Sequence, residues 1–278
     1  MSSNKNTPIL INYEELTRQI IEEHNKVRTN PSSYIEKISA CLELFKGDVL
    51  YKSGEDPMKT LEGKVAFKQA IEFLRQQKPL NSLKHDERLS QTCSDHISDI
   101  GPKGKATHES SNGENVSDRI EKYCEWDGAC TENIDFGTKI AENVIINFIV
   151  DDGIPKRPNR SNLFNPQLNF IGVASGAHTE HVICTVVNYV AGVRNLGESS
   201  ADGKNFISDY MKRAEENKKN PNKEKNPFQE DDLDAPFNTT SVKIIKLTKI
   251  INGKSKKITR KIYSLSDNTQ HIVEIIDA

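Results

Sequence analysis

Several absences narrow the class of protein to which this chain can belong. The sequence has no apolar run long enough to cross a bilayer, and its first ten residues lack the apolar core of a signal peptide. Its five cysteines are odd in number and scattered, which argues against the disulfide framework of small secreted domains. We therefore expect free thiols and a cytoplasmic setting, with no transmembrane segment. Pairing of Cys124 with Cys130 across an intervening turn stays open but is not favoured.

Common catalytic and ligand-binding motifs are also missing. The chain contains no glycine-rich phosphate loop, no Gly-x-Ser-x-Gly element and no Cys-x-x-Cys pair. A net charge of −2 provides no overall field for nucleic acid. The spacing of His178, His181 and Cys184 suggests a metal site only superficially. If all three lie on one strand, His181 faces the opposite side from the other two, so we expect no zinc site there.

Hydrophobic periodicity predicts helices in the first 150 residues and strands after them. The Asn30–Pro31 step should end the first helix, because the residue before proline avoids the helical region. Helices are expected over 13–29, from about 32 onward, and over 63–77, 86–101, 116–124 and 137–152. The β-branched segments 168–176 and 181–193 predict strands. This order favours an α+β domain, with helices packed on a mostly antiparallel sheet.

The composition divides the chain into four parts. A short N-terminal tail (1–12) precedes a main domain (13–195). A polar linker (196–240) follows, with one short helix expected near 206–214. The last part (241–278) has alternating apolar residues, an Asn252–Gly253 turn and a further turn at 266–268, which predict a β-hairpin or a three-stranded meander. Because such a small hairpin is marginally stable by itself, we expect it to dock on another surface.

The C-terminal strands are basic. Residues 241–261 contain eight lysines and arginines and no acidic residue. Lysines on edge strands prevent aggregation, and this explanation competes about equally with docking to an acidic protein surface. Nucleic acid is less favoured, because single-strand binding platforms interleave aromatic residues with the charges. The candidate docking residues are Lys243, Lys246, Lys249, Lys256, Lys257, Arg260 and Lys261.

Polar residues also recur along the main domain. His108 follows a short glycine-containing loop, Glu132 precedes the most apolar helix, and Asp151 and Asp152 follow that helix. A single histidine is more often structural than functional. Three polar positions on one framework make a shared site more plausible, although composition alone does not identify one.

Five segments occur in the order typical of one family. They are HNKVRTNP, DHISDIGPKGKATH, TENI, DDGIPKRPNRSNLFNPQLNFIGVA and ICTVVNYVAG, and together they extend over roughly residues 13–195. On these motifs the chain resembles the CAP superfamily, also called the SCP domain, which includes cysteine-rich secretory and plant pathogenesis-related proteins. It looks most like the members without a signal peptide from single-celled, often ciliated or flagellated, eukaryotes.

The resemblance implies a three-layer α-β-α sandwich, to which the pattern of residues 241–278 adds a C-terminal β-hairpin extension. The family cleft typically holds two histidines and two acidic residues, which bind a divalent cation in some members. By position, His108 matches the first histidine, Glu132 the first acid, and Asp151 or Asp152 the second acid. Asn159 stands where the second histidine is expected. Because an amide oxygen is a weak zinc ligand, we expect no cofactor and at most weak zinc binding through His108 and Glu132.

These observations favour an intracellular binding or scaffold module that is not an enzyme. It would dock to a larger protein assembly through its C-terminal hairpin, and the subfamily resemblance points to a ciliary, axonemal or cytoskeletal one. The alternative is a metal-dependent or hydrolytic activity at the cleft. Lipid or sterol binding is a third class, which rests on the resemblance only.

Overall fold

The computed structural model describes residues 11–196, 239–251, 254–265 and 270–276. The α-helices are α1 (Tyr13–Thr29), α2 (Ile35–Cys41), α3 (Lys64–Gln76), α4 (Glu87–Ile100), α5 (Val116–Ile120), α6 (Ala141–Val150) and α7 (Pro158–Leu163). Short 3₁₀ turns occupy Pro31–Tyr34, Leu42–Leu44 and Gly101–Lys103. The expected helix near 206–214 lies outside the described residues.

Seven strands of the described chain form the central sheet, in the order β4-β6-β7-β5-β10-β9-β8. Their bounds are β4 (Lys84–His85), β5 (Cys124–Phe136), β6 (Phe170–His178), β7 (Val182–Asn195), β8 (Thr239–Ile251), β9 (Lys254–Leu265) and β10 (Gln270–Ile276). The pairs are antiparallel except β4 with β6, which is parallel. A smaller sheet joins β1 (Phe45–Lys46), β2 (Val49–Leu50) and β3 (Met58–Lys59).

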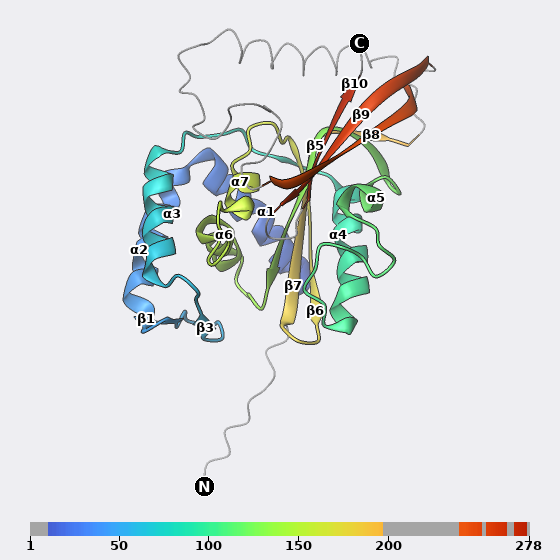
Figure 1. The fold of residues 1–278 in the computed structure, drawn as a ribbon. Coiled ribbons are helices and arrows are strands. Elements are labelled where there is room, and N and C mark those ends of the chain that lie inside the picture. Colours follow the sequence, from blue (N-terminus) through green and yellow to red (C-terminus); the bar gives the residue numbers. More distant parts are fainter. Residues whose placement is uncertain (1–10, 197–238, 252–253, 266–269, 277–278) are drawn as a thin grey trace.

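Helices cover both faces of the sheet and make a three-layer sandwich (Figure 1). Strand alternation assigns the faces. On β7, Val187 and Tyr189 pack in the large core cluster that includes α1 and α6, whereas Val186 packs with α4. Asn188, on the same side as Val186, donates to Thr92 Oγ1 of α4 (2.8 Å). The expected α-β-α sandwich is therefore confirmed.

Local signals explain where the helices begin and end. The Asn12 side chain accepts from the backbone N–H of Glu15 and caps α1, which ends at Thr29 before the expected Asn30–Pro31 break. Asp86 caps α4, and Asn115 forms a capping box with Asp118 at α5. These caps fix the starts of α4, which carries His96, and of α5, which carries Arg119.

Residues 124–136 form a long strand that the sequence analysis missed. We expected a helix to reach residue 124 and strands only after residue 150. Instead α5 ends at Ile120, and β5 runs beside β7 from Cys124 to Phe136. The alternation on β5 is hidden because Glu132, Asn133 and Asp135 are polar yet buried.

The C-terminal meander, which we define as β8, β9 and β10, joins the same sheet. β10 pairs with β5 at two positions, Ile272 with Cys130 and Val273 with Ala129. The side chains of Ile262 and Ile272 are buried in a cluster with Trp126 of β5. The three strands form a meander that packs on β5 of the chain's own domain.

The close packing of α4 on β6 supplies a stability prediction. A Cβ on Gly172 would lie 2.2 Å from the carbonyl carbon of Leu89 and 2.4 Å from the backbone nitrogen of Ser90. Because neither backbone atom can rotate away, we expect Gly172→Ala to lower the free energy of unfolding by about 3 kcal/mol. Urea denaturation measures this change, and a loss below about 0.5 kcal/mol, typical of an unconstrained surface position, would contradict the packing described.

Candidate functional site

His108 and Glu132 lie in direct contact. His108 Nδ1 donates to Glu132 Oε1 across 2.8 Å. The imidazole is partly exposed, whereas the carboxylate is almost completely buried. Glu132 projects from β5 toward α4 and α5, the same side on which Cys130 packs with Ile120. The structure thus brings together the two residues that match the first histidine and first acid of the family.

Arg119 of α5 completes this cluster and was not foreseen. Its Nη2 donates to Glu132 Oε2 (2.5 Å), while Nη1 donates to the backbone oxygen of His108 (3.0 Å) and to Ser110 Oγ (3.2 Å). Both oxygens of the Glu132 carboxylate therefore have a cationic or imidazole partner. The arginine also fixes the 108–110 loop through its backbone.

The ionisation of Glu132 follows from these contacts. Burial favours the neutral acid, but the Arg119 guanidinium and the His108 hydrogen bond outweigh it and lower the pKa of Glu132 to about 2. The side chain is therefore a carboxylate at neutral pH. Its charge is compensated inside the protein and is not directed to solvent.

His96 of α4 has a structural role beside the cluster. Its Nε2 lies 2.9 Å from the backbone oxygen of Thr107, and its Nδ1 lies 3.2 Å from Ser110 Oγ. Burial lowers the pKa of His96 and favours the neutral ring. Neither His96, which holds this loop, nor His85, whose Nε2 lies 2.8 Å from Ser90 Oγ, takes the place of the second family histidine.

Asp151 and Asn159 form a separate pair between α6 and α7. The backbone N–H and Nδ2 of Asn159 each donate to the Asp151 carboxylate across 2.8 Å. Burial raises the pKa of Asp151 to about 6 despite these bonds. Asn159 is thereby committed to linking the end of α6 to the start of α7. Asp151 itself adopts a left-handed backbone conformation with φ 52°.

Asp152 points elsewhere, to the segment before α3. Its carboxylate accepts from the backbone N–H groups of Leu61 (2.6 Å) and Glu62 (3.0 Å). Neither this side chain nor that of Asp151 contacts the His108–Glu132 pair. We expected one of the two aspartates to serve as the second acid of a common cleft. Instead, Asp151 links the end of α6 to the start of α7, and Asp152 binds the segment before α3.

The sheet separates these two groups of residues. Asn133, the residue after Glu132, donates through Nδ2 to the backbone oxygen of Asn159 (3.0 Å). Because neighbouring residues on a strand face opposite sides, Asn159 lies across the sheet from the Glu132 side chain. The four family positions therefore do not converge on one set of ligands. Among the described residues, no group of three or more His, Cys, Asp or Glu side chains is placed to hold a metal ion.

This arrangement makes a prediction about zinc. Asn159→His should leave zinc binding weak, in the millimolar range, for two reasons. The new imidazole would face Asp151, and the Glu132 carboxylate would still be paired with Arg119. Isothermal titration calorimetry with zinc chloride on the wild-type chain and on the variant measures this. Micromolar binding by either protein would show that the cluster rearranges into a metal site.

The candidate docking residues of the meander fall into two groups. Lys246, Lys256 and Lys257 are exposed. Arg260, which we expected to face a partner, is instead buried. It pairs with Glu121, and its guanidinium lies 5.7 Å from the centre of the Trp126 ring. This expectation was wrong because Arg260 shares a strand face with the buried Ile258 and Ile262. The side chains of Lys243, Lys249 and Lys261 lie outside those described.

The 178–184 segment also differs from expectation. β6 ends at His178 and β7 begins at Val182, so His181 lies in the turn between them. The rings of His178 and His181 are 5.0 Å apart, and both contact Phe136. The argument from strand alternation was therefore wrong, because it assumed one continuous strand. All five cysteines are buried and unpaired, so Cys124 and Cys130 form no bond.

Comparison with known proteins identifies the family. A family model described as the cysteine-rich secretory protein family, CAP, matches residues 21–189. The chain belongs to the CAP family. No curated protein matched this CAP chain. Among the described residues of the CAP protein, none of the helices is long and apolar enough to span a membrane.

Two solved structures are similar to this CAP protein. An outer surface protein from Borrelia burgdorferi is 20% identical, with a TM-score of 0.34 over 46% of this chain and 90% of the other. An extracellular protein containing an SCP domain from Bacillus anthracis is 18% identical, with a TM-score of 0.33 over 40% of this chain. The match spans about a third of that second protein, 34% of its length.

Proposed function

We propose that this CAP-family protein is a non-catalytic binding module that joins a larger intracellular protein assembly through its C-terminal meander. The observation that carries the proposal is the position of β8. It is the last strand of the sheet order, and within the described residues no strand pairs with its outer edge. A strand edge of this kind accepts an extended segment of a partner through backbone hydrogen bonds.

The charge on the meander suggests what kind of partner it binds. Lys246 on β8 and Lys257 on β9 are exposed, and the register pairs Lys257 with Thr248. Lys246 and Thr248 share a face, so both lysines lie on the side opposite the buried Ile258. Self-pairing of two β8 strands would bring lysine-rich segments together, which is unfavourable. We therefore propose an acidic, extended segment as the partner.

The chemistry of the His108 site supports a role without catalysis. Both carboxylate oxygens of Glu132 accept hydrogen bonds, one from His108 and one from Arg119. Asn159 cannot transfer a proton near neutral pH as histidine does. The buried free cysteines suit a reducing compartment. The resemblance to signal-less members from ciliated cells makes a ciliary or cytoskeletal assembly the first one to examine.

Charge reversal of the exposed lysines tests the docking proposal. We expect the full-length Lys246→Glu/Lys257→Glu variant to lose recruitment to the native assembly, whereas Lys46→Glu, an exposed lysine on β1, serves as the matched control. Binding of the wild-type protein should weaken with added salt, because exposed charges are screened beyond about 10 Å at 0.1 M. Quantitative co-sedimentation of each tagged protein with the assembly provides the measurement. Full recruitment of the double variant would refute this proposal.

One observation supports a second candidate function, proton transfer at His108. A buried carboxylate that orients a partly exposed imidazole is the arrangement used by general bases in hydrolases. His108→Ala separates the candidates. A docking module should keep its recruitment in this variant, while a hydrolase should lose turnover. Loss of a measured hydrolytic activity in His108→Ala, with recruitment unaffected by the lysine reversals, would favour the enzyme.

A further inference from the structure

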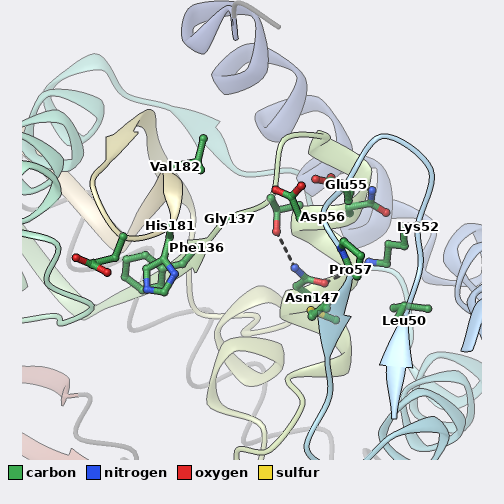
Figure 2. Close-up of a pocket in the computed structure, with 14 residues that line it drawn as sticks. Leu50, Lys52, Glu55, Asp56, Pro57, Phe136, Gly137, Asn147, His181 and Val182 are labelled. Atoms are coloured by element: carbon green, nitrogen blue, oxygen red, sulfur yellow. Dashed lines mark hydrogen bonds between the residues drawn. The ribbon is translucent and has the colours of Figure 1, made fainter. Parts of the chain in front are cut away.

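A cavity of about 280 Å³ lies apart from the His108 cluster and the meander. Three segments far apart in sequence line it, namely the β2–β3 connection, the segment from the end of β5 into α6, and the β6–β7 turn. Figure 2 shows Phe136, His181 and Val182 on one side and Lys52, Glu55 and Asn147 on the other. The size is near the lower end for small-molecule pockets, so the space suits one small ring.

The ionised groups on the polar side already have partners. The Glu55 carboxylate accepts from the backbone N–H groups of Lys139 and Ile140 at the start of α6, and from Asn143 Nδ2. Asp56 pairs with Lys139 Nζ at 2.7 Å. The charges of these two carboxylates are thus balanced by a helix N-terminus and by a lysine.

Lys52 is the cation of the cavity lining. Its Nζ donates to Asn147 Oδ1 (3.3 Å), and Asn147 Nδ2 donates in turn to Asp135 Oδ2 (2.8 Å). Burial lowers the pKa of Lys52 and raises that of Asp135 to about 6, so the low-dielectric surroundings disfavour both charges. Within the described part of the chain Lys52 makes this one side-chain hydrogen bond, which leaves further N–H groups of its amine to serve a ligand.

The lining offers little attraction to an ionic ligand of either sign. The carboxylates of Glu55 and Asp56, which would attract a cation, already have partners, and burial disfavours the charged form of Lys52, which would attract an anion. A neutral ligand depends on neither attraction. It must accept hydrogen bonds from Lys52 and donate them to carboxylate oxygens, and hydroxyl groups do both.

The opposite side of the cavity is apolar and exposed at its rim. Phe136 contacts the His181 ring, with centroids 5.2 Å apart. Val182 is 55% exposed and has a left-handed backbone conformation, φ 68°, which is unfavourable for a β-branched residue. An apolar ligand face placed here would remove Val182 and the aromatic rings from water.

We propose that this cavity binds one neutral, polyhydroxylated ring of monosaccharide size. Lys52 donates to the ligand oxygens, the carboxylate side accepts from its hydroxyl groups, and Phe136, His181 and Val182 cover its carbon face. The site is independent of the docking function, because no residue of the meander lines it. A free sugar, a cyclic polyol and a sugar attached to another molecule share this chemistry.

Three matched sugars test the charge argument on the full-length protein. D-Glucose, D-glucosamine and D-glucuronate differ in charge on similar rings, and N-acetyl-D-glucosamine and myo-inositol extend the neutral set. Saturation-transfer NMR with titration should show millimolar binding of at least one neutral member. Binding of both charged members should be at least about tenfold weaker, because an ammonium or carboxylate group would leave water without gaining an unpaired opposite charge in the cavity. Absence of binding by all neutral members, or tighter binding of a charged one, would overturn the proposal.

Variants then locate the bound ring. Lys52→Met keeps most of the side-chain length and removes the donor, so we expect affinity to fall about tenfold. His181→Ala on the exposed rim should also weaken binding, and it gives an independent result if Lys52→Met fails to fold. Lys46→Met, an exposed lysine outside the cavity, is the matched control. Competition by methyl β-D-glucoside distinguishes a free from an attached sugar. Affinity unchanged in a folded Lys52→Met and in His181→Ala would place binding elsewhere and refute the site.

Discussion

Arg119→Met should lower the free energy of unfolding by about 3–5 kcal/mol at pH 7, which is the usual cost of leaving a buried charge without its partner. The arginine is buried and contacts Glu132 Oε2 at 2.5 Å. Its removal leaves the Glu132 carboxylate with His108 as its remaining partner. Denaturant unfolding of the full-length protein measures the change. The double variant Arg119→Met/Glu132→Gln should recover part of the loss, because it removes the uncompensated charge.

The pH dependence of stability gives this prediction an internal check. In the wild-type protein the pKa of Glu132 is about 2 when folded and 4.5 when unfolded. Its stabilising contribution of about 3 kcal/mol is therefore present above pH 4.5 and is lost as the pH falls toward 2. The comparison with Glu132→Gln isolates this contribution from those of Asp135 and Asp151, whose raised pKa values act in the opposite direction.

Arg119→Met should reverse the slope. Without the guanidinium, burial dominates and raises the pKa of Glu132 above its unfolded value. The variant then becomes more stable, relative to pH 7, as the pH falls toward 4.5. Equal pH slopes in the wild type and Arg119→Met, or a loss at pH 7 below about 1 kcal/mol, would show that this ion pair is of the weak, solvent-screened kind.

Deletion of residues 236–278 should destabilise the CAP domain by about 3 kcal/mol, the cost of uncovering a large buried aromatic side chain. A hairpin that served only for docking could be deleted without loss of stability in the rest of the domain. In the structure, however, Ile262, Ile272 and Arg260 cover Trp126, which is 1% exposed. The meander is therefore part of the domain's packing as well as its proposed docking element.

Thermal unfolding followed by tryptophan fluorescence measures this effect, since Trp126 is the one tryptophan of the chain. The deletion should red-shift the emission of the folded protein and lower the transition temperature. Lys246→Glu/Lys257→Glu is the matched control and should change neither, because both lysines are exposed. A truncated protein with unchanged emission and stability would mean that the meander does not rest on β5.

The sequence predicted most of the architecture because strong local signals specify it. The Asn30–Pro31 break, the caps of α1 and α4 and the β-branched runs of β6 and β7 act within a few residues. β5 was missed for a physical reason. Its buried polar residues, such as Asn133 and Asp135, are stabilised by partners on α6 and α7 that lie far away in sequence.

The candidate site was predicted in part. The resemblance indicated His108 and Glu132, which are in contact, but spacing cannot show on which side of a strand a residue lies. The resemblance therefore grouped Asp151 and Asn159 with the His108–Glu132 cluster, which lies on the other side of the sheet. Arg119 was missed because a single arginine on a short polar helix is usually a solvated side chain. An arginine that shares a helix face with a buried apolar residue, as Arg119 does with Val116 three positions earlier, was the available signal.

Amide hydrogen exchange across β8 tests the central claim most directly. In an antiparallel pair, about half of the backbone N–H groups of β8 bond to β9 and the others point to the open edge. The outward groups should exchange fast in the free full-length protein and become protected when it joins its native assembly, while exchange around His108 stays the same. Protection of the 107–114 segment, with no change along β8, would contradict the account and place binding at the His108 cluster.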